Sequence, residues 1–446
     1  MPCSAYTTDE QVIAQLWLPP LLSRVFHTHT EDTDGKTEIN FDRLWLLLAD
    51  EVVCVSTETL AKKTVVLGIT GSIAAVRTIE LAHELIRRGA TVQGVMTEGA
   101  QRIIHPDAVE CATGNPVITR WTGRVPWVEY CADGGSGDLL LIAPCTAATI
   151  GKIAHGIPDT LVSIFAATAI GSGMPVVIAP AMCMDMYNSI VRANIEILLE
   201  NGVTIVGPVI EEGKAKIAGS DDIVRWVERT LSGSALDGRR VIITGGATAE
   251  PIDPVRMITS RASGKMGTEL AFEAFRRGAD VTLVHRGHTG FTGIQEIYVE
   301  TAEDMIDAVI NELEKGYDIL LSAAAISDYT LDPSRDKIES GAQLTLNLRP
   351  TEKLLEAVRS TYPEITVVGF KLETASGDTL IKRAKEAMTR YGLNMVVANT
   401  VKSMGREDGE VWIIDNDHGI DHVSGAKSVI ASEIFDRISG LPEQER

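Results

Sequence analysis

The sequence has little of what marks disulfide-stapled, metal-binding or membrane proteins. Its 446 residues include only six cysteines, with no CxxC pair and none after Cys183, which argues against a disulfide framework and a cysteine zinc site. No apolar run approaches the roughly 20 residues of a membrane helix. Asp9 and Glu10 stand where a secretory signal would carry basic residues. These absences predict a cytoplasmic protein without a membrane partner.

Positive charge is also scarce. The chain has 41 Lys plus Arg against 61 Asp plus Glu, a formal net charge of −20, which repels phosphate backbones and argues against general nucleic-acid binding. A small phosphorylated ligand stays compatible, because a few basic groups can gather in one pocket. The 45% hydrophobic and 23% charged residues are an ordinary globular mix, and the length predicts at least two packed cores.

From Thr64 onward, short β-rich runs alternate with helix-like segments, which predicts an α/β protein with largely parallel sheets. The expected strands cover residues 65–69, 91–96, 139–143 and 176–179, then 240–244, 281–284, 319–322, 366–370 and 395–398. A small, polar, Gly-containing stretch at 232–238 separates the two series. We therefore expect two doubly wound, Rossmann-like domains, at 63–231 and 239–446, joined by a linker at 232–238. Residues 1–62 form an N-terminal extension without an interpreted function.

The first expected strand runs into the sequence GITGSIAA, which ends at Ala75. Its glycines permit a tight turn, and the N-terminus of a following helix offers N–H groups to a phosphate. The spacing is not GxGxxG, so it gives weak support to a dinucleotide site. Thr97 and Thr146 follow the next two expected strands. Since parallel strands end at one edge of a sheet, these turns predict a phosphate site.

Together with the methionine-rich sequence APAMCMDMY at 179–187, these turns resemble the flavin-binding cysteine decarboxylases over residues 64–231. The resemblance implies a flavodoxin-like domain that binds FMN. The FMN contacts that it implies are Gly71, Ser72, Ile73, Thr97, Thr146 and Met182.

The same stretch departs from that family at its catalytic positions. Tyr130 stands at the place of the family's catalytic histidine, Cys183 replaces the asparagine of its PAMN segment, and Ala148 replaces the asparagine of its PATANT loop. The stretch 211–217 lacks the active-site cysteine of bacterial forms and looks like the archaeal form. Tyr130 and Cys183 become the candidate catalytic residues. Because a phenol is a weaker base than imidazole near neutral pH, flavin binding is better supported than decarboxylation.

A second motif lies at 244–267, where TGGATAEPIDPVR is followed by MITSRASGKMG. Gly246 lets the backbone approach a ligand, and the stretch at 263–267 opens a helix. Lys265 is not a Walker lysine, since Thr259 and Met266 occupy places that a P-loop gives to Gly and to Ser or Thr. The motif closely resembles the phosphopantothenate-cysteine ligases, and the resemblance covers residues 238 to about 435.

The ligase resemblance implies a set of site residues. It implies that Lys337 is catalytic, and that Ser260, in place of the family's asparagine, affects the onward reaction of an acyl-nucleotide. The implied substrate and nucleotide contacts are Gly246, Arg256, Lys265, Asp328, Lys337, Thr351, Glu352, Lys353, Leu354, Phe370, Lys385 and Arg390. The implied co-substrate is CTP, with Mg2+ held through its phosphates, because the sequence carries no side-chain metal motif.

The order of the two resemblances is that of the bifunctional decarboxylase and ligase family of coenzyme A biosynthesis, in an archaeal-like form. The family implies 4'-phosphopantothenate and cysteine as substrates, and a homo-oligomer with trimer contacts in the first domain and dimer contacts in the second. One alternative is a ligase whose flavin domain is catalytically silent, which the replacements at Tyr130, Cys183 and Ala148 favour. The intact ligase motifs disfavour a purely regulatory flavoprotein. The choice between CTP and ATP stays open.

Overall fold

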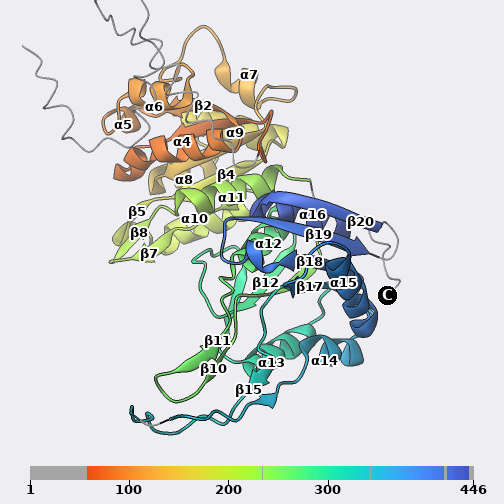
Figure 1. The fold of residues 1–446 in the computed structure, drawn as a ribbon. Coiled ribbons are helices and arrows are strands. Elements are labelled where there is room, and N and C mark those ends of the chain that lie inside the picture. Colours follow the sequence, from red (N-terminus) through yellow and green to blue (C-terminus); the bar gives the residue numbers. More distant parts are fainter. Residues whose placement is uncertain (1–57, 234, 342, 416–418, 441–446) are drawn as a thin grey trace, which may run out of the picture. The chain divides into compact units, whose positions relative to one another are not determined.

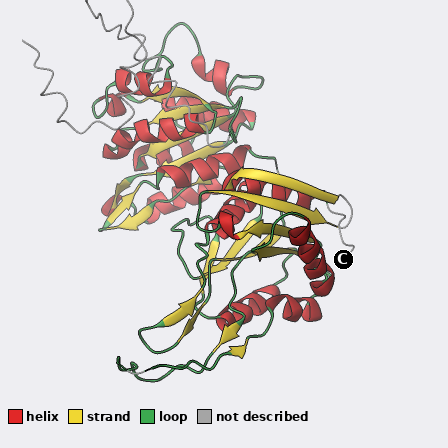
Figure 2. Ribbon diagram, viewed as in Figure 1, coloured by secondary structure: helices red, strands yellow, loops and turns green. Residues whose placement is uncertain are grey.

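The computed structural model describes residues 58–233, 235–341, 343–415 and 419–440. Most of the extension expected at 1–62 lies outside these residues. The described chain forms two large sheets, each with helices packed on both faces (Figures 1 and 2). This confirms the α/β prediction. Within the described residues, no helix is both long enough and apolar enough to cross a membrane.

The first sheet has five strands in the order β2-β1-β3-β4-β6. Every neighbouring pair is parallel. The strands are β1 (Thr64–Ile69), β2 (Thr91–Met96), β3 (Leu139–Cys145), β4 (Val176–Pro180) and β6 (Thr204–Ile205). In chain order this is the flavodoxin-like arrangement 2-1-3-4-5, in which the chain changes direction between β1 and β3. The four strands expected in this half are present, three of them longer by one or two residues.

Alternate residues of these strands enter two different cores. Val65 and Leu67 pack with α4 and α11 on one face, whereas Val66 packs with α8, α9 and α10 on the other. The helices are η1 (Ile73–Arg77), α4 (Thr78–Arg87), α5 (Glu98–Gln101), α6 (Pro106–Thr113), α7 (Pro126–Cys131), α8 (Ala147–Ala154), α9 (Leu161–Ser172), η2 (Met184–Met186), α10 (Ser189–Glu200) and α11 (Ser220–Leu231). A small separate sheet joins β5 (Met182–Cys183), β8 (Lys214–Lys216) and β7 (Val209–Glu211).

The second sheet has eight strands in the order β13-β12-β9-β14-β17-β18-β19-β20. They are β9 (Arg240–Gly245), β12 (Asp280–His285), β13 (Gln295–Tyr298), β14 (Ile319–Ser322), β17 (Thr366–Glu373), β18 (Met395–Thr400), β19 (Asp408–Asp415) and β20 (Gly419–Ala426). In chain order the first six positions read 3-2-1-4-5-6, which is the Rossmann arrangement with its crevice between β9 and β14. The edge strand β13 and the antiparallel strands β19 and β20 were not predicted. β20 is mostly exposed, so it lacks the apolar run that identified the others.

Helices cover both faces of this sheet as well. α12 (Lys265–Arg276) and α16 (Lys427–Ser439) pack on one face, and α13 (Ala302–Leu313), α14 (Leu354–Thr361) and α15 (Asp378–Tyr391) on the other. The shorter elements are η3 (Val401–Ser403) and the paired strands β10 (Ala249–Pro251) with β11 (Met257–Thr259) and β15 (Tyr329–Thr330) with β16 (Arg349–Pro350). Within the stretch predicted as a linker, Leu236 is buried in the core beneath α12.

Helix α12 approaches the end of β9 through two glycines. A Cβ atom added at Gly267 would lie 2.7 Å from the Cα atom of Gly245, closer than real Cβ atoms come to backbone. Only a residue without a side chain therefore lets α12 start directly over the end of β9. This contact fixes where the first turn of α12 stands relative to the edge of the sheet.

Gly267→Ala should lower the free energy of unfolding by about 1–3 kcal/mol, because the added methyl group must push backbone apart. The matched control is Gly171→Ala, at a helical glycine in α9 whose added Cβ would have no atom within 4 Å. That variant should gain up to about 1 kcal/mol, since alanine favours a helix over glycine. The measurement is urea unfolding of both variants. If Gly267→Ala and Gly171→Ala had equal free energies of unfolding, the contact between α12 and β9 would not require glycine at position 267.

Candidate functional site

The carboxyl ends of β1 and β3 are tied together by one buried hydroxyl. Thr70 is 1% exposed, and its Oγ1 donates to the carbonyl oxygen of Pro144 at 2.7 Å and accepts from the backbone N–H of Thr146 at 3.0 Å. This bond holds the turn after β1 against the turn after β3, at the point where the chain changes direction. Open α/β sheets bind ligands at this point.

The hydroxyls expected to meet a phosphate cap the helical segments that start at this edge. Ser72 accepts from the N–H of Ala74, Thr97 from that of Ala100 and Thr146 from that of Thr149, at 3.2 to 3.4 Å. Each side chain therefore shapes its own turn. The hydroxyl of Thr97 also donates to the carbonyl of Ile69 at 3.4 Å, which joins the turn after β2 to the end of β1. Thr146 Oγ1 also lies 3.0 Å from Thr149 Oγ1.

Gly71 lies where the turn after β1 meets the segment after β2. A Cβ atom there would come within 3.0 Å of the carbonyl carbon of Gly99. Ile73 lies two residues further on and is 78% exposed. The structure thus brings Gly71, Ser72 and Thr97 together at one edge, with Thr146 joined to them through Thr70.

Tyr130 lies away from these turns. Its hydroxyl donates to Oε1 of Gln93, a buried residue inside β2, and its ring packs in the core beside α8 and α9. Burial, followed by the charge of Glu129, raises the pKa of Tyr130 above its ordinary value of 10.0. The phenol therefore keeps its proton at neutral pH and can donate but not accept one.

The methionine-rich segment contributes mainly exposed groups. Met182 is half-buried and pairs with Ala215, and Cys183 is exposed and pairs with Lys214. Met184 and Met186 are 39% and 46% exposed. The candidate catalytic residues Cys183 and Tyr130 therefore lie on separate elements, β5 and α7.

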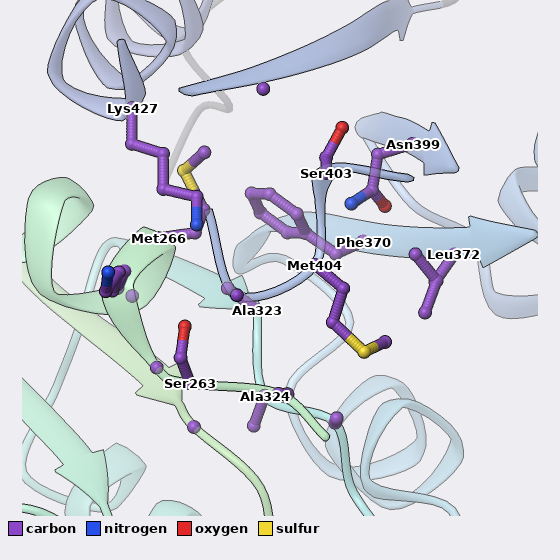
Figure 3. A pocket seen from close by; sticks show the side chains of 18 of the residues that line it. Ser263, Met266, Ala323, Ala324, Phe370, Leu372, Asn399, Ser403, Met404 and Lys427 are labelled. Atoms are coloured by element: carbon purple, nitrogen blue, oxygen red, sulfur yellow. The ribbon is translucent and has the colours of Figure 1, made fainter. Parts of the chain in front are cut away.

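In the second half, a cavity opens at the crevice between β9 and β14 (Figure 3). One wall is the loop that starts α12, a second wall comes from the residues after β14, and a third from the segment after β18. Its lining residues are Gly246, Ala262, Ser263, Gly264, Lys265, Met266, Gly267, Ala323, Ala324, Ala325, Phe370, Leu372, Asn399, Ser403, Met404, Gly405, Gly409, Val411, Lys427 and Ile430. Phe370, Leu372 and Met404 give it an apolar side suited to a planar ring.

The floor of this cavity is bare backbone. Gly246 and Gly264 both have positive φ, 76° and 81°, and a Cβ at Gly264 would lie 3.2 Å from the Cα of Gly246. Gly264 caps α12 without a side-chain hydrogen bond, so the first N–H groups of the helix face the loop. Such N–H groups bind anions. Lys265 follows at once and forms an ion pair with Glu407.

A second hollow adjoins the first and shares four lining residues with it, Ala324, Ala325, Phe370 and Leu372. Asp328 forms an ion pair with Lys353 there. Thr351 joins the segment after β16 to the segment before β15. Its N–H donates to the carbonyl of Asp328 at 3.1 Å, and its hydroxyl donates to the carbonyl of Ser327 at 2.6 Å. Glu352 and Leu354 also line this hollow. These residues, which lie far apart in the sequence, come together as expected from the ligase resemblance.

Arg256 belongs to a third group of residues, held by a carboxylate that the sequence analysis did not select. Asp253 accepts from the N–H groups of Val255, Arg256 and Ile338, at 2.8, 2.8 and 3.1 Å, and from Nη1 of Arg256 at 2.5 Å. Burial alone would raise the pKa of Asp253, but the backbone donors and the guanidinium outweigh it and lower the pKa to about 2. Arg256 also donates to the carbonyl of Ile338 at 3.0 Å. Asp253 thus positions both Arg256 and the residue after Lys337.

Besides Arg256 and Thr351, four expected site residues of the ligase half do not line either hollow. Lys337 and Ser260 are exposed, on the loop before β16 and just after β11. Lys385 and Arg390 lie on the solvent side of α15, because the buried positions of that helix are Leu380, Ala384 and Met388. Arg390 forms an ion pair with Glu356 at 3.2 Å. Their roles therefore rest on the family resemblance and not on a cavity wall.

Two family models match the chain. Residues 54–232 match the family model described as Flavoprotein, and residues 236–441 match the one described as DNA/pantothenate metabolism flavoprotein C-terminal domain. The protein named coenzyme A biosynthesis bifunctional protein CoaBC in Thermococcus kodakarensis is 44% identical over 396 residues, which cover 87% of this chain and 98% of the relative. The chain belongs to the CoaBC family.

Further CoaBC members are similar over most of their length. The protein of Methanocaldococcus jannaschii is 36% identical, over 86% of this chain and 95% of its own, and that of Bacillus subtilis is 32% identical, over 86% and 98%. Among solved structures, the C-terminal domain of a CoaBC protein covers 46% of this chain and 97% of its own at 28% identity, with a TM-score of 0.40. The FMN-dependent cysteine decarboxylase SpaF covers 38% and 99% at 27% identity, with a TM-score of 0.33.

Asp253→Asn should loosen the segments around Arg256 and Ile338, because an amide nitrogen cannot accept their N–H groups. Hydrogen exchange of peptides spanning 252–256 and 334–339 should become faster. Since the folded pKa is lowered from 3.8 to about 2, the carboxylate contributes stability fully above about pH 4. That contribution is lost as the pH falls through about 2. The difference in urea stability between wild type and variant should therefore narrow from pH 4 toward pH 2.

Asp332→Asn is the matched control, since Asp332 lies on the loop between β15 and β16 that also carries Ile338. It is 93% exposed and lies beside Arg349 at 3.4 Å. It should leave exchange unchanged. Unchanged exchange in Asp253→Asn as well would contradict the positioning role of Asp253.

Proposed function

We propose that this chain is a bifunctional enzyme of coenzyme A biosynthesis. Its second half joins cysteine to 4'-phosphopantothenate with CTP, and its first half decarboxylates the 4'-phosphopantothenoylcysteine to 4'-phosphopantetheine with FMN. The observation that carries the proposal is similarity to CoaBC proteins through both halves, in one order, over 87% of the chain. The cavity at the crevice between β9 and β14 supports the ligase half, because it joins an apolar wall to an anion-binding helix start.

In the ligation, a carboxylate oxygen of 4'-phosphopantothenate attacks the α-phosphorus of CTP, and pyrophosphate leaves. The amine of cysteine then attacks the acyl carbon of the acyl-cytidylate, the bond from that carbon to the phosphate oxygen breaks, and CMP leaves. Mg2+ bound to the phosphates offsets part of their charge. The protein's task is to hold the reacting groups together and to stabilise charge on phosphate oxygens.

We assign a separate part of this task to each of several residues. The ring of Phe370 provides a flat apolar wall for the base, and the first N–H groups of α12 with Lys265 face the phosphates. We assign Lys337 to the α-phosphate, as a mobile point charge, and Arg256 to a substrate phosphate or carboxylate, as a fixed fork. Asp253 supports both assignments, because it fixes Arg256 and the N–H of Ile338.

The first half fits an FMN phosphate at the turns after β1 and β3. Ser72, Thr97 and Thr146 present hydroxyls there, and the backbone at Gly71 lies too close to Gly99 to accept a side chain. When bound, FMN supplies the redox chemistry that makes loss of CO2 from the cysteinyl unit feasible. Ile73 and Met182 are the further contacts in this proposal.

A second candidate keeps the ligase and leaves the flavin half without turnover. The bond from Tyr130 to Gln93 and its raised pKa favour this candidate, because the residue at the place of the family histidine is neither free nor basic at neutral pH. Exposed Cys183 also lacks the amide of the family asparagine.

We further propose a closed homo-oligomer in the cytoplasm. Apolar side chains at or near the flavin edge are well exposed: Ile73 is 78%, Ile190 70% and Met186 46% exposed. Burying them against other copies would remove apolar surface from water. Trimer contacts are assigned to the first half and dimer contacts to the second.

Incubation with 4'-phosphopantothenate, cysteine, CTP and Mg2+ should yield 4'-phosphopantetheine, detected by mass spectrometry. ATP in place of CTP tests the nucleotide. Lys337→Gln should abolish formation of the acyl-cytidylate and of every later product, because it removes the charge assigned to the α-phosphate. Lys315→Gln, an exposed lysine on the loop after α13, is the control and should keep full turnover.

Three results would change the proposal. Accumulation of 4'-phosphopantothenoylcysteine alone would select the ligase with a silent flavin half. Normal turnover of Lys337→Gln would remove Lys337 from the nucleotide site. No product with either nucleotide would overturn the proposed function.

Gly71→Val should yield purified protein without the flavin absorbance near 450 nm, since its side chain would collide with the backbone of Gly99 and displace the turn that holds the phosphate. Gly123→Val is the control, because a Cβ there has no atom within 4 Å and φ is not positive. A yellow Gly71→Val protein with the wild-type spectrum would refute this placement.

A further inference from the structure

Lys427 is the most deeply buried lysine on the wall of the ligase cavity. It is the first residue of α16 and only 7% exposed, and its side chain reaches past Met266 toward the cavity (Figure 3). A cation in the first turn of a helix opposes the helix dipole. Burial of its charge also costs free energy unless an opposite charge compensates it. The position is therefore unfavourable for the protein by itself.

Its direct partner is a neutral group. Nζ of Lys427 donates to the backbone carbonyl of Arg406, and its backbone N–H donates to the carbonyl of Glu407 at 3.1 Å. A carbonyl accepts a hydrogen bond but does not neutralise the ammonium. Burial first, and then the charge of Lys265, lower the pKa of Lys427, against the opposite effects of Glu407, Asp408 and Glu269.

Lys265 presents a second charge to the same cavity from the first residue of α12. Helices α12 and α16 pack against each other, so two helix starts and two lysines meet at one end of the cavity. The ion-pair partner of Lys265 is Glu407, which is 84% exposed. Exposed ion pairs contribute little to stability. An anion with several charges can therefore replace Glu407 as the partner of Lys265.

We propose that Lys427 binds the phosphate chain of the nucleotide, together with Lys265 and the first N–H groups of α12. This inference rests on the proposed ligase function and adds a phosphate-binding residue to its site. The ligand class is a nucleoside triphosphate, because the opposite side of the cavity, formed by Phe370, Leu372 and Met404, is apolar and takes a base. A triphosphate supplies negatively charged oxygens that can contact the ammonium directly, whereas its present hydrogen-bond partner is a neutral carbonyl.

Lys427 could instead serve only to hold the loop at 401–408 through the carbonyl of Arg406. The two roles predict different effects of a Lys427 substitution on affinity, depending on how many phosphates the ligand carries. A loop anchor affects cytidine, CMP and CTP alike, since all three use the same base pocket. A phosphate ligand affects CTP most and cytidine not at all.

The test is calorimetric titration of the full-length protein with cytidine, CMP and CTP. Lys427→Gln keeps an N–H donor for the Arg406 carbonyl and removes the charge. We expect the dissociation constant for CTP to rise about tenfold, that for CMP to rise less and that for cytidine to stay unchanged, with Lys427→Arg close to wild type. Lys402→Gln, at an exposed lysine of η3 outside the cavity wall, should leave all three constants unchanged.

An unchanged dissociation constant for CTP in Lys427→Gln would overturn the inference alone. An equal rise for all three ligands would also overturn it and assign Lys427 to the loop. Thermal unfolding shows whether Lys427→Gln keeps its fold. If it does not, Lys427→Met is the second variant without the charge. Its dissociation constants for the same three ligands should rise most for CTP, less for CMP and not at all for cytidine. Absence of CTP binding by the wild type would overturn the proposed nucleotide together with this inference.

Discussion

The ligase half depends on how closely helix α12 can approach the end of β9. With no side chain at Gly245 or Gly267, the two backbones meet, and the first turn of the helix starts directly over the crevice between β9 and β14. Gly246 and Gly264 then bring the turn and the loop into contact from the other side. A side chain at Gly267 would push the start of the helix, with its free N–H groups, away from the crevice. The shape of the cavity and the position of Lys265 depend on this spacing.

In the flavin half, hydroxyl side chains and not bare backbone hold the turns at the edge of the sheet. Thr70 joins the ends of β1 and β3, and Ser72, Thr97 and Thr146 each cap a helical segment. The hydroxyl of Thr97 also donates to the carbonyl of Ile69, so it joins two neighbouring turns. Missing side chains therefore shape the edge of one sheet, and shared hydroxyls shape the edge of the other.

The sequence predicted nine strands of the two large sheets because buried strands are continuous apolar runs, and the motifs and the resemblance selected Gly246 and Phe370. It missed the two-residue strand β6, the edge strand β13 and the antiparallel strands β19 and β20. β20 is mostly exposed and carries no apolar run. Asp253 was overlooked, since its importance lies in three backbone donors that only the folded loop brings to it. Lys427 lies far from every motif in the sequence, and only the packing of α16 on α12 brings it to the cavity. Lys385 and Arg390 were selected because basic residues occur in the same order as in the ligase family. The fold nevertheless places them on the exposed side of α15 and not on a cavity wall.

Phe370 has a consequence for how this site can change over evolution. Its ring is a wall of two hollows at once, the one beside the start of α12 and the one beside Asp328 and Lys353. A substitution of Phe370 that changes the shape of one hollow therefore also changes the other. The two hollows cannot evolve independently at this residue.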